Sequence, residues 1–476
     1  MDAQYDFGMI GLGVMGSNLL LNLADHGYAV IGFDLKPERG EALETAASEG
    51  TVVKGVNTLS EMVLSLKKPR KIMMLVPAGK PVDDVISNLL PLLEDNDIVI
   101  DGGNSFYKET MHRINFLQDK GIHFFGMGVS GGEMGARTGP SMMPGGDKEA
   151  YQYLKPLLEA IAAKAGEKPC VAYMGADAAG HYVKMVHNGI EYAMMQMISE
   201  AYDILRRGVQ CTNPELHAIF KKWNEGSLKS FLIEITTEIF KTGDSATPGN
   251  EDFLVDAILD QAGSKGTGKW TAQEAMNLPM PIPTIDMAVC MRDLSVYKAD
   301  RKQAADLYKT VIQPLSVSKE ALAADLEASL HFCFMIAYIQ GLNMLAKASE
   351  DLKMNIPLPS VIQVWKSGCI IRSSMLEVFE KAYTTNASQP NLLLDADVAT
   401  VLKKNEQNLR NILALSFGAK IPAASMSSAL AYFDAFCSER LPVNLIQAQR
   451  DYFGAHTYKR IDQEGVFHTE WYSGNE

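Results

Sequence analysis

The chain has 476 residues and a formal net charge of −13, and it is 47% hydrophobic and 21% charged. This length exceeds what one ordinary hydrophobic core holds, so we expect two or more domains. The negative charge argues against nucleic acid or an anionic membrane as the main partner. An anionic substrate would therefore need a locally basic pocket.

No run of 18 apolar residues is present, and the N-terminus lacks the basic-then-apolar pattern of a secretion signal. We therefore expect a cytoplasmic protein without a membrane span. The six cysteines are widely spread, with neither a CxxC pair nor metal-ligand spacing, and we expect buried free thiols and no bound metal.

The first 175 residues alternate short apolar strands with helical patterns, which predicts βαβ units in a mainly parallel sheet. A helix is expected over 15–26, and strands over 7–10, 29–33, 71–76, 97–101 and 121–126.

From about 180 to 435 the strand signals fade and helical periodicity dominates. The long helical segments are 181–207, 213–241, 316–350, 359–383 and 393–415. The two halves of this region have similar helix lengths, which hints at a duplication, although their sequence identity is too weak to establish one. The predicted fold is an α/β N-terminal Rossmann domain (1–178), a large all-α domain (179–436) and a short C-terminal tail (437–476).

A glycine-rich turn follows the first strand and opens the first helix, as dinucleotide binding requires. It consists of Gly11, Leu12, Gly13, Val14, Met15 and Gly16. The first glycine permits the turn, the second admits the pyrophosphate and the third allows close helix packing. The alternative is a glycine turn without a ligand.

Asp34 ends the second strand, where a carboxylate accepts from the ribose 2′-hydroxyl and repels a 2′-phosphate, which favours NAD. Lys36 and Arg39 lie close enough to soften that repulsion, and Asp34 could instead be an ordinary turn residue. We expect further cofactor contacts from the residues that follow two later strands, at the carboxyl edge of the sheet. These residues are Val76, Pro77 and Ala78, and Asn104.

One face of the helical stretch 181–192 is polar although the helix is otherwise apolar. Lys184, His187, Asn188, Glu191 and Tyr192 fall within an arc of about 140°. The alternative is a solvated surface face. Because the polar face is narrow and apolar residues follow it, we favour a site, since such groups are costly to bury unless something polar contacts them.

These motifs, in this order, resemble the 6-phosphogluconate dehydrogenase family over nearly the whole chain. The resemblance rests on GLGVMG, IDGGNS, GVSGGEMGAR, GPSMMPGG, GHYVKMVHNGIEY, GSKGTGKW, GCIIR and NLIQAQRDYFGAHTY. It implies oxidative decarboxylation of 6-phosphogluconate with NADP or NAD in the pentose phosphate pathway and gluconate utilisation. It also implies a homodimer, with pairing into a tetramer left open, and no nucleic acid or membrane partner.

The resemblance also implies roles for matching residues. Lys184 corresponds to the catalytic base and Glu191 to the catalytic acid. The groups that hold the carboxylate and hydroxyls of the sugar acid correspond to Asn104, Ser130, Gly131, Gly132, His187 and Asn188. The phosphate-binding set corresponds to Tyr192, Lys265, Thr267 and Arg292, and Arg450 and His456 correspond to the pair that the tail inserts into the partner's site.

Residue chemistry agrees with several of these roles. Lys265 and Thr267 flank a glycine and supply a cation and a hydroxyl suited to a phosphate, although the same turn could be a surface loop. Arg292 follows an apolar stretch and needs an anionic partner, which could also be an internal salt bridge.

The coenzyme preference is less clear. NADP-using members commonly carry Asn-Arg-Thr where this chain has Asp34, Leu35 and Lys36, so the family favours NADP and the local charge favours NAD. Pro77 also replaces a lysine often present there.

Two other functions would fit parts of this pattern. A smaller-substrate β-hydroxyacid dehydrogenase would lack the long helical domain, the phosphate set and the tail. A catalytically silent nucleotide-binding protein would be expected to lack Lys184 or Glu191.

Overall fold

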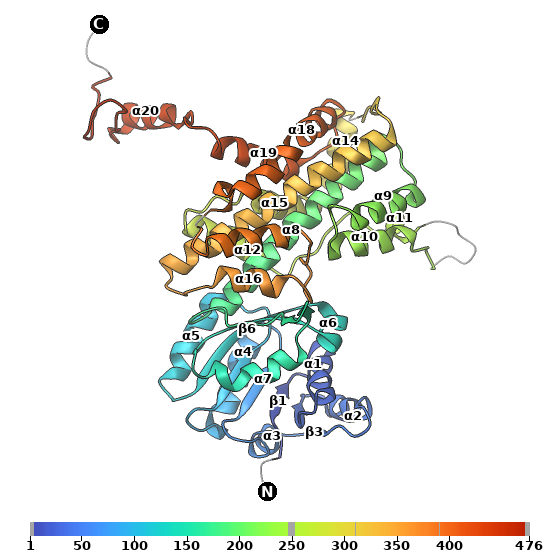
Figure 1. Ribbon diagram of the computed structural model, residues 1–476, viewed down its shortest axis with the longest axis vertical. Helices are drawn as coiled ribbons and strands as arrows, with labels where there is room; N and C mark the ends of the chain where they lie inside the picture. The colour runs from blue at the N-terminus through green and yellow to red at the C-terminus, as the bar shows by residue number, and fades with distance from the viewer. Residues whose placement is uncertain (1–3, 246–252, 310, 390, 472–476) are drawn as a thin grey trace. The chain divides into compact units, whose positions relative to one another are not determined.

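Figure 1 shows a computed structural model of the chain, which describes residues 4–245, 253–309, 311–389 and 391–471. The chain folds into two compact units, Met1–Ala429 and Leu430–Glu476. The first unit contains an α/β domain followed by a large helical region, as the sequence predicts.

A seven-stranded sheet organises the α/β domain, with the strand order β3-β2-β1-β4-β5-β6-β7. Strands β1 to β6 are parallel and β7 is antiparallel to β6. The strands are β1 (Phe7–Ile10), β2 (Val30–Phe33), β3 (Val53–Val56), β4 (Lys71–Met74), β5 (Ile98–Asp101), β6 (His123–Ser130) and β7 (Ser141–Gly145). Up to β6 this is the order of Rossmann folds, in which ligands bind at the switch point between β1 and β4.

Helices cover both faces of the sheet. Buried side chains of α1 and α7 form one apolar cluster with the strands, and those of α3, α4 and α5 form another. The helices are α1 (Val14–Asp25), α2 (Pro37–Thr45), α3 (Leu59–Leu64), α4 (Lys80–Leu89), α5 (Tyr107–Gln118), α6 (Gly132–Thr138) and α7 (Tyr151–Ile161).

The helical region is built around two long helices, α8 and α15, which pack against each other. Its helices are α8 (Ala179–Asp203), α9 (Asn213–Glu225), α10 (Phe231–Lys241), α11 (Leu254–Ala257), α12 (Thr267–Asn277), α13 (Pro283–Ser295), α14 (Lys298–Tyr308), α15 (Lys319–Asp351), α16 (Leu358–Trp365), α17 (Leu376–Thr385), α18 (Ala396–Gly418) and α19 (Ala424–Phe436). By length and composition α15 could cross a membrane, but 67% of its apolar window is buried inside the protein, as in a core helix.

The prediction of single helices over 213–241 and 359–383 is wrong. The first segment is split between α9 and α10, and the second between α16 and α17. In both segments a glycine, Gly226 or Gly368, follows three residues after a buried tryptophan and is part of the break, because glycine weakens a helix interior.

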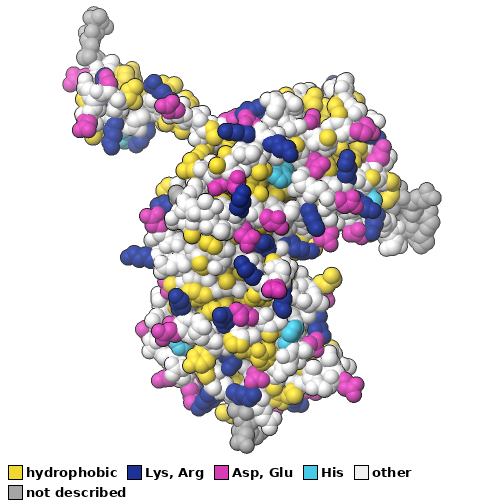
Figure 2. Space-filling view, viewed as in Figure 1, with side chains coloured by type: hydrophobic (Ala, Val, Ile, Leu, Met, Phe, Trp, Pro, Cys, Tyr) yellow, Lys and Arg dark blue, Asp and Glu magenta, His cyan; other side chains and the backbone are white. Residues whose placement is uncertain are grey.

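The second unit contains the end of α19, the helix α20 (Val443–Gly454) and a segment that runs to Trp471. Its centre is the buried carboxylate of Asp451, which accepts from the Thr457 and Thr469 backbone N–H groups at 2.8 and 3.1 Å, and from Trp471 Nε1 at 2.9 Å. His468 Nδ1 lies 2.9 Å from the same carboxylate. Figure 2 shows hydrophobic side chains at the surface of this unit. Leu445, Ile446 and Phe453 are among its exposed hydrophobic residues.

Candidate active site

The helix α8 carries the residues predicted to be catalytic, and most of them are buried. Lys184 and His187 are 6% and 0% exposed, Asn188 and Tyr192 are buried, and Glu191 is half-buried. The structure therefore disagrees with the alternative of a solvated surface face.

Glycines let α8 lie directly on the sheet. A Cβ atom added at Gly128 in β6 would lie 2.3 Å from Lys184 Cβ. One added at Gly180 in α8 would lie 2.1 Å from the Gly126 carbonyl oxygen. Real side chains never approach so closely, so only glycine permits this contact, which presses the stem of Lys184 against the strand that ends at Ser130.

The ring of His187 connects the polar groups. Its Nδ1 lies 3.4 Å from Lys184 Nζ, 3.1 Å from Asn188 Oδ1 and 3.8 Å from Glu191 Oε2. Its Nε2 lies 3.4 Å from Ser130 Oγ at the end of β6. The structure thus brings an amine, an imidazole, a carboxyl group and a hydroxyl together.

Burial moves the ionisable groups of this cluster toward their neutral forms. It lowers the pKa of Lys184, against the opposing charge of Glu191. It raises the pKa of Glu191, against the opposing charges of Lys184 and Arg292. Burial, together with the charge of Lys184, holds the pKa of His187 well below its ordinary value. A buried amine of lowered pKa can accept a proton, and a carboxyl group of raised pKa can donate one.

His181, one turn before Lys184, fixes α8 to the α/β domain. Its Nε2 lies 3.0 Å from the Asp101 carbonyl oxygen and its Nδ1 lies 2.7 Å from Thr110 Oγ1. Because a carbonyl only accepts, Nε2 carries the proton and the Thr110 hydroxyl donates to Nδ1. The Asp101 carboxylate in turn accepts from Ser105 Oγ at 2.6 Å, which shapes the loop that presents the exposed Asn104.

Two members of the predicted phosphate set, Lys265 and Thr267, lie where α12 begins. Thr267 is its first residue, and the preceding Gly266 has a φ of +94°, a left-handed conformation that glycine adopts without strain. A Cβ atom at Gly268 would lie 2.5 Å from the Tyr192 ring, so α12 lies directly over α8. Lys265 is exposed just before the helix.

Arg292 joins this group through Tyr192. Its guanidinium carbon lies 3.6 Å from the centroid of the Tyr192 ring, a cation–π contact. The alternative of an internal salt bridge does not hold among the described residues, since no carboxylate there pairs with Arg292. A half-buried guanidinium that makes no ion pair within 4.0 Å among these residues is suited to a phosphate.

The glycine turn has the geometry that a dinucleotide needs. Gly11 has a φ of +92°, and a Cβ at Gly16 would lie 1.9 Å from the Gly11 carbonyl oxygen. A Cβ at Gly13 would meet nothing within 4 Å, so the N-terminus of α1 is open to a pyrophosphate. Val76, Pro77 and Ala78 lie in the turn after β4, across the switch point from this one.

Asp34 is tied to the glycine turn. It accepts from the Leu12 N–H at 2.8 Å and the Lys36 N–H at 3.0 Å, and Arg39 Nη1 lies 3.0 Å away. These donors outweigh the effect of burial and lower the pKa of Asp34. Leu35 beside it is 90% exposed.

Comparisons with known proteins identify the family of this chain. The profile of the "6-phosphogluconate dehydrogenase, C-terminal domain" matches residues 180–471, and the "NAD binding domain of 6-phosphogluconate dehydrogenase" matches residues 6–175. A decarboxylating 6-phosphogluconate dehydrogenase of Lactococcus lactis subsp. lactis is 47% identical, over 99% of both chains. The chain belongs to the 6-phosphogluconate dehydrogenase family.

Two further relatives of this family bear on the coenzyme. A Bacillus subtilis 6-phosphogluconate dehydrogenase described as NADP(+)-dependent is 46% identical over 98% of this chain and 99% of its own. A Plasmodium falciparum 6-phosphogluconate dehydrogenase, solved as the apo form and with NADP+ or 6-phosphogluconate, is 43% identical and superposes with a TM-score of 0.94, covering 98% of this chain and 100% of its own. Because the chain matches these relatives over nearly its full length, the comparisons disagree with the alternative that it is a smaller β-hydroxyacid dehydrogenase.

The two predicted tail residues lie in the second unit. Arg450 is exposed on α20, where its Nη1 donates to Gln447 Oε1 at 3.2 Å, and the ring of the exposed His456 lies 6.0 Å from that of Phe453. The role of this pair in a partner's site stays a prediction of the family resemblance.

Sequence reasoning missed three contributors to the site. His181 stands in the same motif as Lys184, but nothing in the sequence indicates its partners across the domain boundary. The backbone N–H of Ile370 donates to Ser130 Oγ at 3.4 Å, and the charge of Lys184 acts on the buried thiol of Cys369. These contacts join residues about 240 and 185 positions apart, which no local pattern reveals.

Proposed function

We propose that this enzyme oxidises and decarboxylates 6-phosphogluconate to ribulose 5-phosphate and CO2, with NAD(P) as the oxidant, in the pentose phosphate pathway. The observation that carries this proposal is the buried cluster of Lys184, His187 and Glu191, in which burial shifts the lysine and the glutamate toward their neutral forms. Membership of the family over the full length supports the same reaction.

Lys184 performs the first proton transfer. The neutral amine accepts the proton of the C3 hydroxyl, which makes C3 ready to lose a hydride. When bound, NAD(P) supplies the hydride acceptor. The open N-terminus of α1, and the space at Gly13, fit its pyrophosphate.

The same lysine, now an ammonium, assists the loss of CO2. The bond between C1 and C2 breaks, and its electron pair forms a C2–C3 double bond while the C3 carbonyl becomes an enolate oxygen. Lys184 donates to this oxygen, which stabilises its negative charge and gives it a proton.

Glu191 completes the reaction by protonating the carbon that lost the carboxylate, while the neutral Lys184 takes back the proton of the enediol oxygen, so that the enediol becomes the ketone of ribulose 5-phosphate. We assign Asn104, Ser130, Gly131, Gly132, His187 and Asn188 to the carboxylate and hydroxyls of the substrate. Tyr192, Lys265, Thr267 and Arg292 hold its phosphate. The stacking of Arg292 on Tyr192 and the position of Thr267 at the start of α12 support the second set.

Reduction of the coenzyme at 340 nm tests this function directly. With 6-phosphogluconate and either NAD or NADP, the enzyme is expected to produce reduced coenzyme, CO2 and ribulose 5-phosphate in equal amounts. Reduced coenzyme without CO2 would contradict the decarboxylation. Absence of signal with both coenzymes would favour a silent nucleotide-binding protein.

Replacing Glu191 by glutamine is expected to lower kcat about 100- to 1,000-fold, because the amide cannot protonate the enediol. The parent enzyme needs a neutral Lys184 and a protonated Glu191, so its activity rises and then falls with pH. In E191Q the falling limb disappears, and the residual rate rises with pH to a plateau. A bell-shaped profile in E191Q, measured beside the exposed control E350Q, would contradict this role.

For the coenzyme we propose NAD with some use of NADP. The carboxylate of Asp34 lies beside the glycine turn, where it would repel a 2′-phosphate, and the partial neutralisation by Arg39 moderates this effect. The exposed Leu35 offers no charge for a 2′-phosphate.

The double substitution D34N/L35R is therefore expected to shift the ratio of kcat/KM for NADP over NAD toward NADP by at least about tenfold, or about 1.4 kcal/mol. The control L64R places an arginine on the exposed surface of α3 and should leave the ratio unchanged. An unchanged ratio in the double variant would show that Asp34 does not set the preference.

We further propose a cytoplasmic homodimer in which the tail, 437–476, completes the partner's site with Arg450 and His456. The domains are then 1–178 for the coenzyme and 179–436 for the substrate and dimerisation. The exposed apolar side chains of the second unit support a docking role, because a stable chain rarely leaves so many uncovered.

A further inference from the structure

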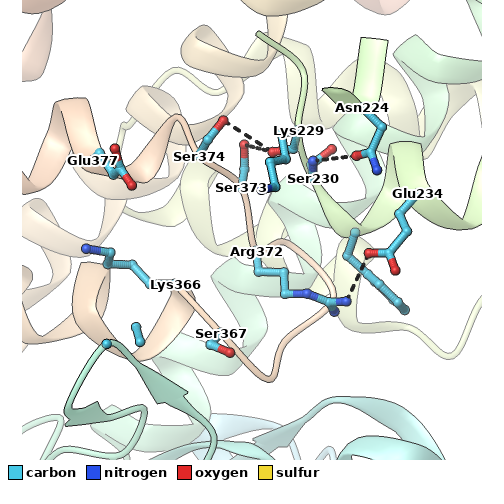
Figure 3. Close-up of a pocket in the computed structure, with 13 residues that line it drawn as sticks. Asn224, Lys229, Ser230, Glu234, Lys366, Ser367, Arg372, Ser373, Ser374 and Glu377 are labelled. Atoms are coloured by element: carbon cyan, nitrogen blue, oxygen red, sulfur yellow. Dashed lines mark hydrogen bonds and ion pairs between the residues drawn. The ribbon is translucent and has the colours of Figure 1, made fainter. Parts of the chain in front are cut away.

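A polar cavity is lined by residues that do not belong to the predicted active site. Its volume is about 540 Å³, within the range of small-molecule sites. It lies between the turn that joins α9 and α10, the loop that joins α16 and α17, and the hairpin of β8 (Lys164–Ala165) and β9 (Lys168–Pro169) (Figure 3).

The two main walls of this cavity repeat the same sequence pattern. Each begins with a buried tryptophan, Trp223 or Trp365, followed three residues later by a glycine. A cation and a serine then follow the glycine, after two intervening residues in the first copy and three in the second. The second copy has one extra residue. The matched residues that line the cavity are Asn224 and Lys366, Lys229 and Arg372, Ser230 and Ser373, Phe231 and Ser374, and Glu234 and Glu377.

The matched residues also meet in space. Ser230 and Ser373 face each other in an antiparallel bridge, in which the Phe231 N–H donates to the Arg372 carbonyl oxygen at 3.1 Å and the Ser374 N–H donates to the Lys229 carbonyl oxygen at 3.0 Å. Equivalent residues pair with each other only across a local two-fold axis. The two main walls are therefore related by approximate symmetry, and two of the cations in the lining, Lys229 and Arg372, come from equivalent positions.

The lining carries more positive than negative charge, in a chain that is acidic as a whole. Three cations, Lys229, Lys366 and Arg372, face two carboxylates, Glu234 and Glu377. Arg372 already pairs with Glu234 at 3.2 Å, and Lys366 pairs with Glu380 at 2.6 Å. In the part of the chain that the structure describes, neither Lys229 nor Glu377 has an ionic partner.

We propose that this cavity binds a phosphorylated polyol. A phosphate dianion offers acceptors on several sides and matches Lys229 together with the flanking Lys366 and Arg372, which bind oxyanions with charge-assisted hydrogen bonds. The amide of Asn224 and the hydroxyl of Ser367 add donors. The unpaired carboxylate of Glu377 accepts from a hydroxyl of the same ligand, so a polyol ester fits better than free phosphate.

The cavity wall continues into the site on α8. The segment between Ser367 and Arg372 lies next to the end of β6, because the Ile370 N–H donates to Ser130 Oγ at 3.4 Å. The Gly368 carbonyl oxygen accepts from the Ser141 N–H at 3.0 Å, which holds the same loop to β7. An occupant of the cavity therefore contacts the loop that supports Ser130, and it is expected to change the KM for 6-phosphogluconate.

Isothermal titration calorimetry of the full-length enzyme tests the proposal, with glycerol 3-phosphate, inorganic phosphate and glycerol as three separate probes. The active site on α8 is kept saturated with 6-phosphogluconate during these titrations. The test rests on the proposed function only because it assumes that 6-phosphogluconate binds there. A separate titration with 6-phosphogluconate alone reveals a failure of the proposed function. The expected result is one saturable site per chain that binds glycerol 3-phosphate more tightly than phosphate, with no binding of glycerol.

Three exposed-residue variants localise that site. K229Q is expected to weaken binding of both anions at least about tenfold. E377Q is expected to remove the advantage of glycerol 3-phosphate over phosphate, and the control K221Q, on the exposed surface of α9, should behave as the parent. Absence of saturable binding, or equal affinities in K229Q and K221Q, would overturn the proposal.

A kinetic comparison tests the link to Ser130. Saturating glycerol 3-phosphate is expected to change the KM for 6-phosphogluconate at least about twofold in the parent and in K221Q, but not in K229Q. The same change in all three enzymes would show that the ligand acts at the substrate site instead, and it would refute the regulatory link.

Discussion

The variant K184M is expected to lose kcat at least about 10,000-fold while it binds coenzyme nearly as the parent does. Methionine matches the length of the buried stem but can neither accept the hydroxyl proton nor stabilise the enolate. Steady-state rates at 340 nm and a separate titration of NAD and NADP measure the two effects. K221M, an exposed substitution on α9, serves as the control.

The same variant is expected to unfold at a higher temperature than the parent at pH 7. Burial lowers the pKa of Lys184, so the unfolded chain binds the proton more tightly than the folded chain does. Stability therefore rises with pH between the lowered pKa and the ordinary value near 10.4, and the cost of burying the amine is largest below this window. K184M lacks this cost, so its advantage in Tm should shrink as the pH approaches 10. Retained turnover would contradict the role of Lys184 as the catalytic base. A Tm below that of the parent at pH 7 would contradict the cost of burying its amine.

Deleting residues 445–476 is expected to eliminate turnover, because the site would lose the partner's Arg450 and His456. R450A should show most of this loss with an intact tail, whereas R440A, also exposed in the tail, should remain active. Rates at saturating 6-phosphogluconate and coenzyme measure the effect.

Mixed dimers separate a tail that acts in the partner from one that acts in its own chain. Co-expressed K184M and R450A chains form dimers in which one of the two sites combines an intact Lys184 with an intact tail from the partner. Random pairing should then restore about a quarter of the parent activity. Activity that stays at the level of the two single variants would show that each tail serves its own chain, and an active truncated enzyme would refute the shared site.

Local patterns were enough to predict the elements that carry the chemistry. Apolar runs bounded by turn residues predicted β1, β2, β4, β5 and β6, because buried parallel strands are continuous in hydrophobicity. They missed β3, whose Lys54 and Gly55 interrupt the run, and β7, in which Pro144 and Gly145 weaken the signal.

The breaks within the helical region were harder to predict than its helices. The segments 213–241 and 359–383 keep helical periodicity on both sides of each break, and their breaks are stabilised by the bridge between Ser230 and Ser373. Such a contact between distant segments overrides local propensity. For the same reason the sequence indicated Lys184 and Glu191 but could not reveal that His181 anchors their helix.

The close contact at Gly128 determines how the enzyme can use one lysine twice. With no Cβ in the way, the first carbons of the Lys184 side chain are wedged between backbone and helix, so only its outer torsions can rotate. The nitrogen therefore sweeps a small volume, and it can take a proton from an oxygen and return one to that oxygen without a rearrangement of the helix. A larger residue at position 128 would displace α8 from the sheet. The Lys184 nitrogen would then be misplaced, although every polar side chain of the site would still be present.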